Sequence, residues 1–425
     1  MNPPPRSESP INTVLIVNGY VQANAGDAAL LAVCRQQVVE AYPTAAVQVA
    51  SLEDPGTVPT FDGVPNIGSI RRFVSDDRRP RPVRLLLRAL GLLVGLAYLL
   101  APRLLTRLVL PRLPVEVRHE VTAAAQADLV VSMGGGYVHG RAGLAGWQNL
   151  YFVLLPLLIA QRHGRLTVFA PQSFGPFEGG PLQHWLVRTV ASRATLLVAR
   201  EVKSVRALQA CRVPDTQVAR GVDSAFALEA TTPRAAVSRL PTGTVGITAR
   251  SWLPPAEQHA YEVGLARTID HLIVRGHPVL LVPQVTADFM QDDDRIVEAR
   301  IAALCTLEPI LCTDRLPYTE LLTLYGECHL FVGTRFHSVI FSLLHRVPCI
   351  AIEYEHKTSG IMADLGLSAW TLPIEEVDAD RLIALVDRLI VEREDYLRQL
   401  DEVLPPYVAR SRAFVTDLRS LDVHG

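Results

Sequence analysis

Lysine is almost absent from this chain of 425 residues. Arginine and lysine together number 41, yet Lys203 and Lys357 are the only two lysines, so arginine supplies nearly all of the positive charge. Because acidic residues number 43, the net charge is −2, which gives no overall electrostatic attraction to nucleic acid or to an anionic membrane. A lysine in a loop after a predicted strand is therefore unusual here, and Lys357 is one.

Cysteine is sparse and scattered. The six cysteines include no C-x-x-C pair, so their spacing supports neither a zinc site nor a disulfide framework. A reducing, cytoplasmic setting is the expectation. The N-terminal segment MNPPPRSESP has no apolar stretch, which predicts no signal peptide and a short disordered arm over residues 1–10.

The common nucleotide-binding fingerprints are missing. The chain contains neither G-x-G-x-x-G nor G-x-x-x-x-G-K-[ST], which excludes the dinucleotide and P-loop motifs. Hydrophobic residues make up 49% of the chain and the mean hydropathy is +0.22, values that exclude a disordered protein. The length leaves room for two or three domains.

Long apolar runs are also missing, with one partial exception. Residues 89–102 carry no charge, but this run is too short to span a membrane as a helix, which needs about 20 residues. The surrounding segment 71–112 holds ten arginines and two aspartates, a local net charge of +8. It suits a helical hairpin lying on an anionic leaflet, or equally a buried helix pair capping the core. On the first interpretation, 83–112 makes peripheral contact with the inner face of the plasma membrane.

Short apolar runs alternate with helical patterns through most of the chain, which predicts parallel sheets covered by helices. The turn-rich segment 230–243 breaks this alternation and marks a domain boundary. We therefore expect an α/β protein of two Rossmann-like domains facing a cleft, over 11–235 and 240–385, followed by helices over 386–425. Strands are expected over the following segments: 12–20, 45–51, 127–133, 166–172, 195–201, 217–222, 244–250, 277–284, near 310, 329–333 and 348–354.

The sharpest local pattern is Gly333-Thr334-Arg335-Phe336-His337-Ser338, at the junction of a predicted strand and a predicted helix with Thr334 as a plausible N-cap. The start of a helix binds anions, and an arginine fork adds bidentate recognition of phosphate or carboxylate. His337 would lie beside that anion; the helix dipole should lower its pKa and a bound phosphate should raise it, which suits a general acid. Alternatively, Arg335 caps a neighbouring element and His337 packs between domains.

A second loop joins the first predicted strand to the first predicted helix, over residues 18–27. Its small and turn-forming residues, Asn24 among them, leave the backbone open to close approach by a ligand. Asp27 could be a general base, although an aspartate at this position more commonly caps the helix.

Further strand-end loops carry other candidate binding residues. Gly134 and Gly135 follow a predicted strand and permit close backbone approach, and Ser173 follows another. Arg200 ends a largely apolar strand and so needs an anionic partner or ligand, and Asp223 lies in an otherwise apolar turn. Lys357 is a candidate phosphate contact, or simply a solvated lysine.

Seven segments in this order resemble the polysaccharide pyruvyl transferase family: NAGDAALL, MGGGYVHG, APQSFGPF, VAREVKS, GVDSAFAL, GITARSW and GTRFHSVIFSLLHRVPCIAIEYEHKTSGIMADLGL. The last segment is specific, whereas the glycine motifs alone are not. The resemblance covers about 11–370 apart from the arginine-rich insert. It implies a GT-B-like fold and transfer of a pyruvyl group from phosphoenolpyruvate to a sugar as a ketal.

Carried over to this sequence, the family's phosphoenolpyruvate-binding Arg and His correspond to Arg335 and His337, with Phe336 between them. Its further cations correspond to Arg200 and Lys357. The family's G-D motif corresponds to Gly26-Asp27, with Asp27 as the proposed base on the acceptor side. The pattern departs from the family's at Tyr137, where relatives more often have a small or polar residue.

This chemistry needs no redox step, and we expect no metal or cofactor beyond phosphoenolpyruvate as donor. The acceptor would be a cell-surface polysaccharide or its lipid-linked precursor. Two other functions fit the same architecture: a nucleotide-sugar glycosyltransferase, and a non-catalytic anion-binding protein.

Overall fold

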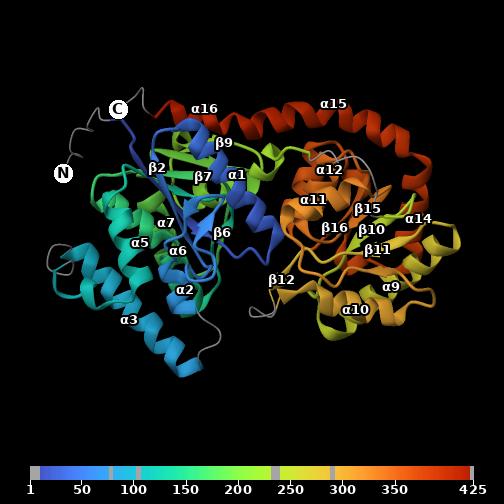
Figure 1. The fold of residues 1–425 in the computed structure, drawn as a ribbon, viewed down its shortest axis with the longest axis horizontal. Coiled ribbons are helices and arrows are strands. Elements are labelled where there is room, and N and C mark those ends of the chain that lie inside the picture. Colours follow the sequence, from blue (N-terminus) through green and yellow to red (C-terminus); the bar gives the residue numbers. More distant parts are fainter. Residues whose placement is uncertain (1–9, 76–79, 102–106, 231–239, 288–291, 422–425) are drawn as a thin grey trace. The chain divides into compact units, whose positions relative to one another are not determined.

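In the computed structural model the chain forms two compact units (Figure 1). The structure describes residues 10–75, 80–101, 107–230, 240–287 and 292–421. The first unit comprises Met1–Val21, Leu30–Ser224 and Arg410–Gly425, and the second comprises Gln22–Ala29 and Ala225–Ala409. The chain thus passes between the units more often than the single predicted boundary implies. The predicted arm and much of the segment 230–243 lie outside the described residues.

The first unit is built on a parallel sheet of seven strands in the order β2-β1-β5-β7-β8-β9, with β6 paired to β7. Its central strands are apolar and buried on both faces, as in β5, which has no exposed residue. The strands are β1 (Thr13–Gly19), β2 (Ala46–Ser51), β5 (Leu129–Ser132), β6 (Gly135–Gly140), β7 (Leu166–Phe177), β8 (Leu196–Ala199) and β9 (Val218–Arg220). A separate small hairpin consists of β3 (Thr60–Phe61) and β4 (Val64–Pro65).

Helices pack on this sheet. Most of α6 is buried, and it contacts β5, β6 and β7 as well as neighbouring helices. The helices are α1 (Ala25–Ala41), α2 (Ile70–Ser75), α3 (Arg81–Leu100), α5 (Val115–Gln126), α6 (Gly143–Arg162), α7 (Pro181–Ala191), α8 (Val202–Ala210) and α16 (Phe414–Arg419). The first turn of α1 is counted with the second unit.

The second unit holds a parallel sheet of six strands in the order β14-β11-β10-β15-β16-β17. From its first strand onward the sheet therefore has the strand order 3-2-1-4-5-6 of a Rossmann fold. The strands are β10 (Val245–Thr248), β11 (Val279–Leu281), β14 (Ile310–Leu311), β15 (Leu330–Gly333), β16 (Cys349–Glu353) and β17 (Thr371–Pro373). A short antiparallel hairpin, β12 (Thr286–Ala287) and β13 (Asp292–Asp293), follows β11.

Helices alternate with these strands, as the pattern of apolar residues predicts. They are α9 (Pro255–Val274), α10 (Asp294–Leu304), α11 (Tyr318–Gly326), α12 (Phe336–Leu344), α13 (His356–Asp364) and α14 (Ala379–Val391). The long helix α15 (Arg393–Arg412) then leads back to the first unit at Arg410. The predicted α/β class with two Rossmann-like domains is confirmed.

Several local predictions were wrong. Residues 53–82, for which the sequence predicts no strand, contain β3 and β4, and two of the three glycines after β5, Gly135 and Gly136, open strand β6 rather than a loop. Strand β17 follows the strand expected to be the last. These elements are short or glycine-rich, so their apolar pattern is too weak to register as a strand or helix.

Two predicted helix caps also differ. Asn24, not Asp27, caps α1, because Oδ1 of Asn24 accepts the backbone N–H groups of Gly26 and Asp27 at 3.1 and 3.4 Å. At α12 the N-cap residue is Arg335 rather than Thr334, and its side chain makes no capping bond. The Thr334 hydroxyl is engaged elsewhere, with the hydroxyl of Tyr261 at 2.8 Å.

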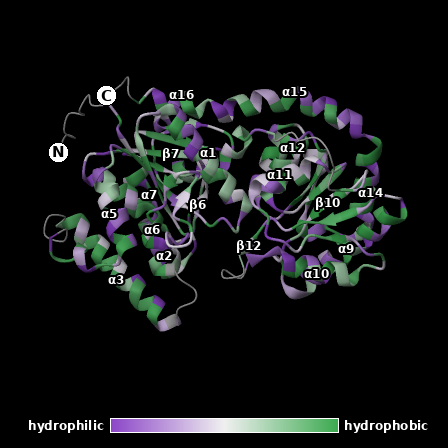
Figure 2. Cartoon of the chain, viewed as in Figure 1, coloured by the Kyte–Doolittle hydropathy of each residue, from purple (hydrophilic) through white to green (hydrophobic). Residues whose placement is uncertain are grey.

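The apolar part of the arginine-rich insert forms α3, which packs against α2 and α6. By length and composition, two helices among the described residues could cross a membrane, α3 and α6. Most of α6 belongs to the core of the first unit, whereas only 11% of the apolar window of α3 is buried. Figure 2 shows α3 as mostly hydrophobic along its length. In the remainder of the predicted hairpin, residues 102–106 lie outside the described residues and Leu110–Arg112 form a short 3-10 helix.

Candidate functional site

In the second unit the strand order reverses between β10 and β15. The connections that leave these two strands run in opposite directions, so their carboxyl ends flank the position where open α/β sheets bind ligands. Thr248 ends β10 and Gly333 ends β15, and these two residues are paired in register. The predicted motif of Gly333–Ser338 therefore lies at this switch point.

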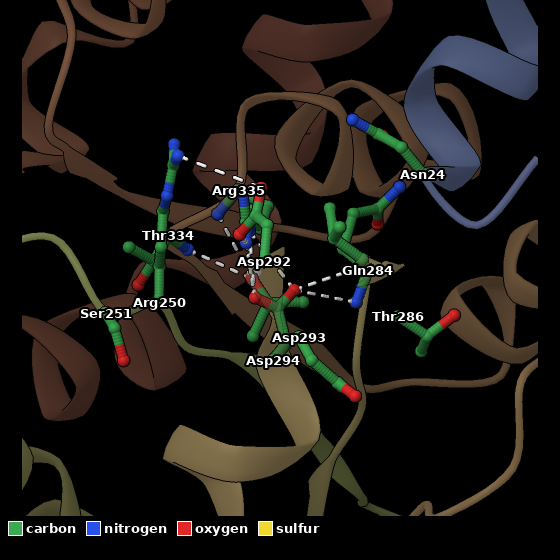
Figure 3. Close-up of polar contacts among 12 residues, drawn as sticks. Asn24, Arg250, Ser251, Gln284, Thr286, Asp292, Asp293, Asp294, Thr334 and Arg335 are labelled. Carbon is green, nitrogen blue, oxygen red and sulfur yellow. Dashed lines mark hydrogen bonds and ion pairs between the residues drawn. The ribbon is translucent and has the colours of Figure 1, made fainter. Parts of the chain in front are cut away.

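Arg335 is buried there and is held by two aspartates (Figure 3). Its Nε and one terminal nitrogen donate to Asp294, with contacts of 2.5 to 3.1 Å, and the same terminal nitrogen donates to Asp292 at 2.5 Å. The two carboxylates differ in burial: the Asp294 side chain is 1% exposed and that of Asp292 is 39% exposed. In this structure Arg335 therefore binds neighbouring elements, β13 and α10, as the alternative interpretation of the sequence expects.

The two aspartates also differ in their proton affinity. Burial raises the pKa of Asp294, although the Arg335 guanidinium opposes this. Burial acts in the same direction on Asp292, but there the Arg335 and Arg250 guanidinium groups prevail and hold the pKa below its usual range. Asp294 also accepts the backbone N–H groups of Gln284 and Val285 at 3.1 and 2.9 Å, so the Arg335 ion pair ties the start of α12 to the segment after β11.

Buried hydroxyl groups fix the turn between β15 and α12. Oγ1 of Thr248 accepts the backbone N–H of Thr334 at 3.0 Å and bonds with the hydroxyl of Ser338 at 2.9 Å. The Ser338 hydroxyl donates in turn to the carbonyl of Arg335 at 2.6 Å. The start of α12 is therefore held rigidly on the end of the sheet.

The segment containing Asn24 and Asp27 joins this site across more than 200 positions of sequence. Ala25 donates its backbone N–H to the carbonyl of Gln284 at 3.1 Å, and Thr286 donates to the carbonyl of Ala23 at 2.8 Å. An isolated antiparallel bridge pairs Asn24 with Val285. Residues 22–29 thus extend the short hairpin that follows β11.

This docking brings the two predicted catalytic segments into contact. A Cβ built on Gly26 would lie 2.0 Å from Nδ1 of His337, so the imidazole occupies the space beside the glycine. Asp27 follows Gly26 directly and is buried. The ring of His337 also packs against Phe336 and Phe341, with ring centroids 5.0 and 6.4 Å apart.

Lys357 lies near the same helix start. Its Nζ is 5.3 Å from the centre of the Phe336 ring and 2.7 Å from a carboxylate oxygen of Glu355. The second unit therefore unites six predicted site residues: Asn24, Asp27, Arg335, Phe336, His337 and Lys357.

Arg250, two residues beyond β10, was missed as a site residue. Its guanidinium carbon lies 4.6 Å from the centre of the Trp252 ring and 4.4 Å from that of Tyr354. Its closest carboxylate contact among the described residues is Asp292 at 4.0 Å, and its buried Nε makes no hydrogen bond with any of them. Arg250 is thus less fully neutralised than Arg335 and is held in place by two aromatic rings.

In the first unit, Arg200 brings together two other predicted site residues, Ser173 and Asp223. Its buried guanidinium donates to Asp223, to the Ser173 hydroxyl at 2.8 Å and to Glu201 at 3.2 Å. Burial disfavours the charged form, but Asp223 and Glu201 outweigh it and raise the pKa of Arg200. The anionic partner expected for Arg200 is therefore present within the protein.

The backbone geometry explains why glycine occupies positions 134 and 135, the two predicted glycines of the first unit. A Cβ on Gly134 would lie 2.5 Å from the carbonyl oxygen of Pro171, and Gly135 has a φ of +142°. Nearby, the ring of Tyr137 stacks on Tyr20 at 5.5 Å, and the guanidinium of Arg71 lies 5.8 Å from its centre. The departure at Tyr137 thus places an aromatic stack between the residue that follows β1 and the first half of β6.

The comparisons with known proteins agree with the motifs. The family described as polysaccharide pyruvyl transferase matches residues 24–356, which is most of the chain. The chain belongs to the polysaccharide pyruvyl transferase family. It is also 27% identical over 291 residues to the amylovoran biosynthesis protein AmsJ of Erwinia amylovora, covering 65% of this chain and 68% of that protein.

Solved structures share the fold of this family member at low identity. A putative UDP-N-acetylglucosamine 2-epimerase from Listeria monocytogenes has a TM-score of 0.61 at 12% identity, with 98% of both chains covered. HepE of Anabaena, in complex with UDP-glucose, has a TM-score of 0.56 at 14% identity and covers 97% of this chain and 98% of its own. These similarities establish the GT-B-like fold of two Rossmann-like domains.

Asp292 and Asp294, like Arg250, were not identified as site residues from the sequence. Three consecutive aspartates before a helix look like a solvated, capping segment, and nothing local indicates that two of them point at an arginine about 40 residues later. Arg250 gave a weak signal, because a cation directly beyond a strand end is a frequent ligand position and the aromatic Trp252 lies two residues away.

Proposed function

We propose that this protein transfers the pyruvyl group of phosphoenolpyruvate to a sugar as a ketal and releases phosphate. The acceptor in this proposal is a sugar of a cell-surface polysaccharide or of its lipid-linked precursor. Membership of the polysaccharide pyruvyl transferase family and the similarity to a protein of amylovoran biosynthesis support the reaction class.

One observation carries the proposal furthest: the contact between Gly26 and His337. It puts a histidine in the first turn of α12 against the loop that holds Asp27, although the two segments are far apart in sequence. A proton donor and a proton acceptor are the two groups that ketal formation requires. The contact therefore supports a paired role for His337 and Asp27.

In the proposed mechanism His337 donates a proton to the methylene carbon of phosphoenolpyruvate, which leaves C2 electron-poor. A sugar hydroxyl attacks C2, and Asp27 accepts the proton of that hydroxyl. A second hydroxyl of the same sugar then attacks C2 as the C–O bond to phosphate breaks, and the departing phosphate takes up the proton of that hydroxyl. The ketal and inorganic phosphate are the products, and no electrons are gained or lost.

Cations at the carboxyl end of the second sheet would hold the donor. We propose that Arg335 binds one anionic group, with Asp294 fixing the plane of its fork and the more exposed Asp292 occupying the place of an incoming anion. Arg250 and Lys357 supply further charge, and the first N–H groups of α12 lack partners within the helix. In the first unit, Arg200, Ser173, Asp223, Gly134 and Gly135 remain predicted substrate-binding residues.

The first test does not need the acceptor. Purified protein is heated with and without millimolar phosphoenolpyruvate, and with UDP, the nucleotide that the HepE structures contain, as a competing ligand. A ligand at about 100 times its dissociation constant stabilises a protein by roughly 2.7 kcal/mol, which gives a measurable shift in melting temperature. Stabilisation by phosphoenolpyruvate that is lost in Arg335→Ala supports the proposal, whereas stabilisation by UDP alone points to a nucleotide-sugar glycosyltransferase.

The second test asks for chemistry rather than binding. Phosphate release from phosphoenolpyruvate is measured with candidate glycans for the native protein, His337→Gln and Asp27→Asn. Both variants should lose phosphate release by about 10² to 10⁴-fold, the range for removal of a general acid or base, and Asp27→Asn should keep the stabilisation by phosphoenolpyruvate. Donor binding without phosphate release from any glycan would instead indicate a non-catalytic anion-binding protein.

A further inference from the structure

We infer that α3 carries a docking surface for an anionic lipid bilayer. The surface, here called the leucine face, consists of Leu86, Leu90, Leu93, Leu96 and Leu100. These side chains are 41 to 84% exposed, and they recur at the intervals of three and four that place residues on one side of a helix. A soluble surface helix normally shows the opposite arrangement, with its apolar side inward.

The opposite side of α3 is fixed to the first unit. A Cβ on Gly91 would lie 3.1 Å from Val74 and 3.2 Å from Phe152, and one on Gly95 would lie 2.6 Å from the Tyr151 hydroxyl. The two glycines thus let α3 pack closely on α2 and α6. Because this side is already occupied, the helix presents its leucine face outward as part of a folded unit rather than as a free segment.

The charges around the leucine face determine which partner fits. Helix α3 contains no acidic residue and has Arg81 and Arg84 near its start, whereas Arg88 is turned to the packed side, where its Nε donates to the carbonyl of Val74 at 3.2 Å. Beyond it, Arg107 and Arg112 are exposed. A helix that lies in a membrane interface has apolar side chains in the acyl region and arginines at the level of the lipid headgroups, so this combination fits an anionic leaflet.

A cavity below the helix adds a second observation. It has a volume of about 190 Å³ and lies between α3, α2, α5 and α6. Its lining is almost entirely apolar and includes Val74, Val94, Tyr98, Val117 and Leu155, with Arg112 as the single charged residue among those described. Such a space suits a hydrocarbon chain, which favours a lipid over a second protein as the occupant of this region.

The inference does not depend on the identity of the reaction. If the acceptor is a lipid-linked saccharide, the same surface would hold the enzyme where that acceptor is found. If the proposed reaction is wrong, the leucine face still requires a partner. Its five leucines are 41 to 84% exposed, and an exposed apolar patch of this kind usually marks an interaction site.

The test measures binding of the full chain to lipid vesicles by flotation. Vesicles of phosphatidylglycerol and phosphatidylethanolamine are compared with vesicles of phosphatidylcholine, at low and at high salt. The native protein should float with the anionic vesicles, several-fold less with the neutral ones, and less at high salt because salt screens the arginines. Equal flotation with both kinds of vesicle, or none with either, would overturn the inference.

A charge-matched pair of variants separates the leucine face from general surface effects. Leu86→Glu/Leu93→Glu changes two outward side chains that do not line the cavity, and Leu144→Glu/Leu182→Glu changes two equally exposed leucines on α6 and α7. The first variant should lose at least tenfold in vesicle binding, while the second should lose less than threefold. Equal losses in the two would count against the leucine face.

Two further readouts keep the result interpretable. Both variants should melt within a few degrees of the native protein, because all four positions are exposed. Stabilisation by phosphoenolpyruvate should be unchanged in Leu86→Glu/Leu93→Glu, so a failure of vesicle binding and a failure of donor binding can be told apart. Light scattering of the native protein without lipid tests the remaining occupant: self-association abolished by Leu86→Glu/Leu93→Glu would identify a second copy of the chain and overturn the lipid inference.

Discussion

The imidazole of His337 fills the space that a side chain at Gly26 would need, with Nδ1 only 2.0 Å from the position that a Cβ on the glycine would take. The two residues belong to different sequence motifs, and 311 positions of sequence separate them. Glycine at position 26 is therefore required by the packing of the histidine.

Substitution of Gly26 by alanine should displace the His337 ring without unfolding the protein. Alanine is favoured over glycine within a helix, so the melting temperature should stay within a few degrees of native. Phosphate release should fall by about 10² to 10⁴-fold, as for loss of a general acid. Gly360→Ala is the matched control, since no heavy atom lies within 4 Å of its Cβ position in α13. Native activity in Gly26→Ala would show that the contact has no role in the reaction.

The two aspartates that bind Arg335 should respond differently to neutralisation. Asp294→Asn leaves a buried guanidinium without its inner counter-charge, which costs about 3 to 5 kcal/mol, whereas loss of the partly exposed Asp292 should cost about 1 kcal/mol or less. Urea denaturation monitored by circular dichroism measures both. Asp292→Asn should also bind phosphoenolpyruvate more tightly, because it removes the anion that competes for Arg335. Weaker donor binding in Asp292→Asn would contradict the assigned order of the two carboxylates.

Arg250 is expected to contribute to donor binding. Because a hydrogen bond to a charged group contributes about 1.5 to 3 kcal/mol, Arg250→Ala should raise the dissociation constant of phosphoenolpyruvate about tenfold or more. Arg388→Ala is a suitable control: Arg388 also lies over an aromatic ring, that of Trp370 at 4.5 Å, but two of its nitrogens donate to Glu392, the residue that follows α14. Titration calorimetry decides, and equal affinities for the two variants would remove Arg250 from the site.

Glu120 of α5 should make the stability of the first unit depend on pH. It is buried and accepts the backbone N–H of Ile70 at 2.6 Å, and burial raises its pKa from 4.5 to about 7. Between these two values the folded protein keeps the proton that the unfolded chain loses, so stability falls as the pH rises from about 4.5 to about 7 and then levels off. The total loss is on the order of 3 kcal/mol.

The matched variant is Glu120→Gln, whose amide oxygen can still accept the N–H of Ile70. Its denaturation midpoint, followed from pH 4.5 to pH 8, should lack this decline, so that the variant gains on the native protein as the pH rises. Parallel pH profiles for the two proteins would mean that Glu120 is ionised in the folded state.

The sequence was most informative for features that depend on residues close together along the chain. Strands such as β15 and β16 are short apolar runs between turns, and because a strand in a parallel sheet is buried on both faces, its pattern is recognisable without knowledge of its partners. The same reasoning placed Arg335 and His337 at the start of a helix after a strand. It failed for β6, where glycines gave no pattern, and for the caps of α1 and α12, where several adjacent residues could serve.

The fold class, the family and the motif at the start of α12 can be predicted from local patterns, because periodicity and short motifs depend on whether a residue is buried and on its neighbours along the chain. Which residues meet follows from long-range packing: Arg335 contacts Asp292 and Asp294, and Gly26 contacts His337 in a segment that belongs to the second unit. Long-range packing also decides that the leucine face of α3 is open while its glycine side is packed. A pattern of apolar residues predicts that one side of a helix is buried. The element that packs against that side is determined by contacts between segments that are remote in sequence.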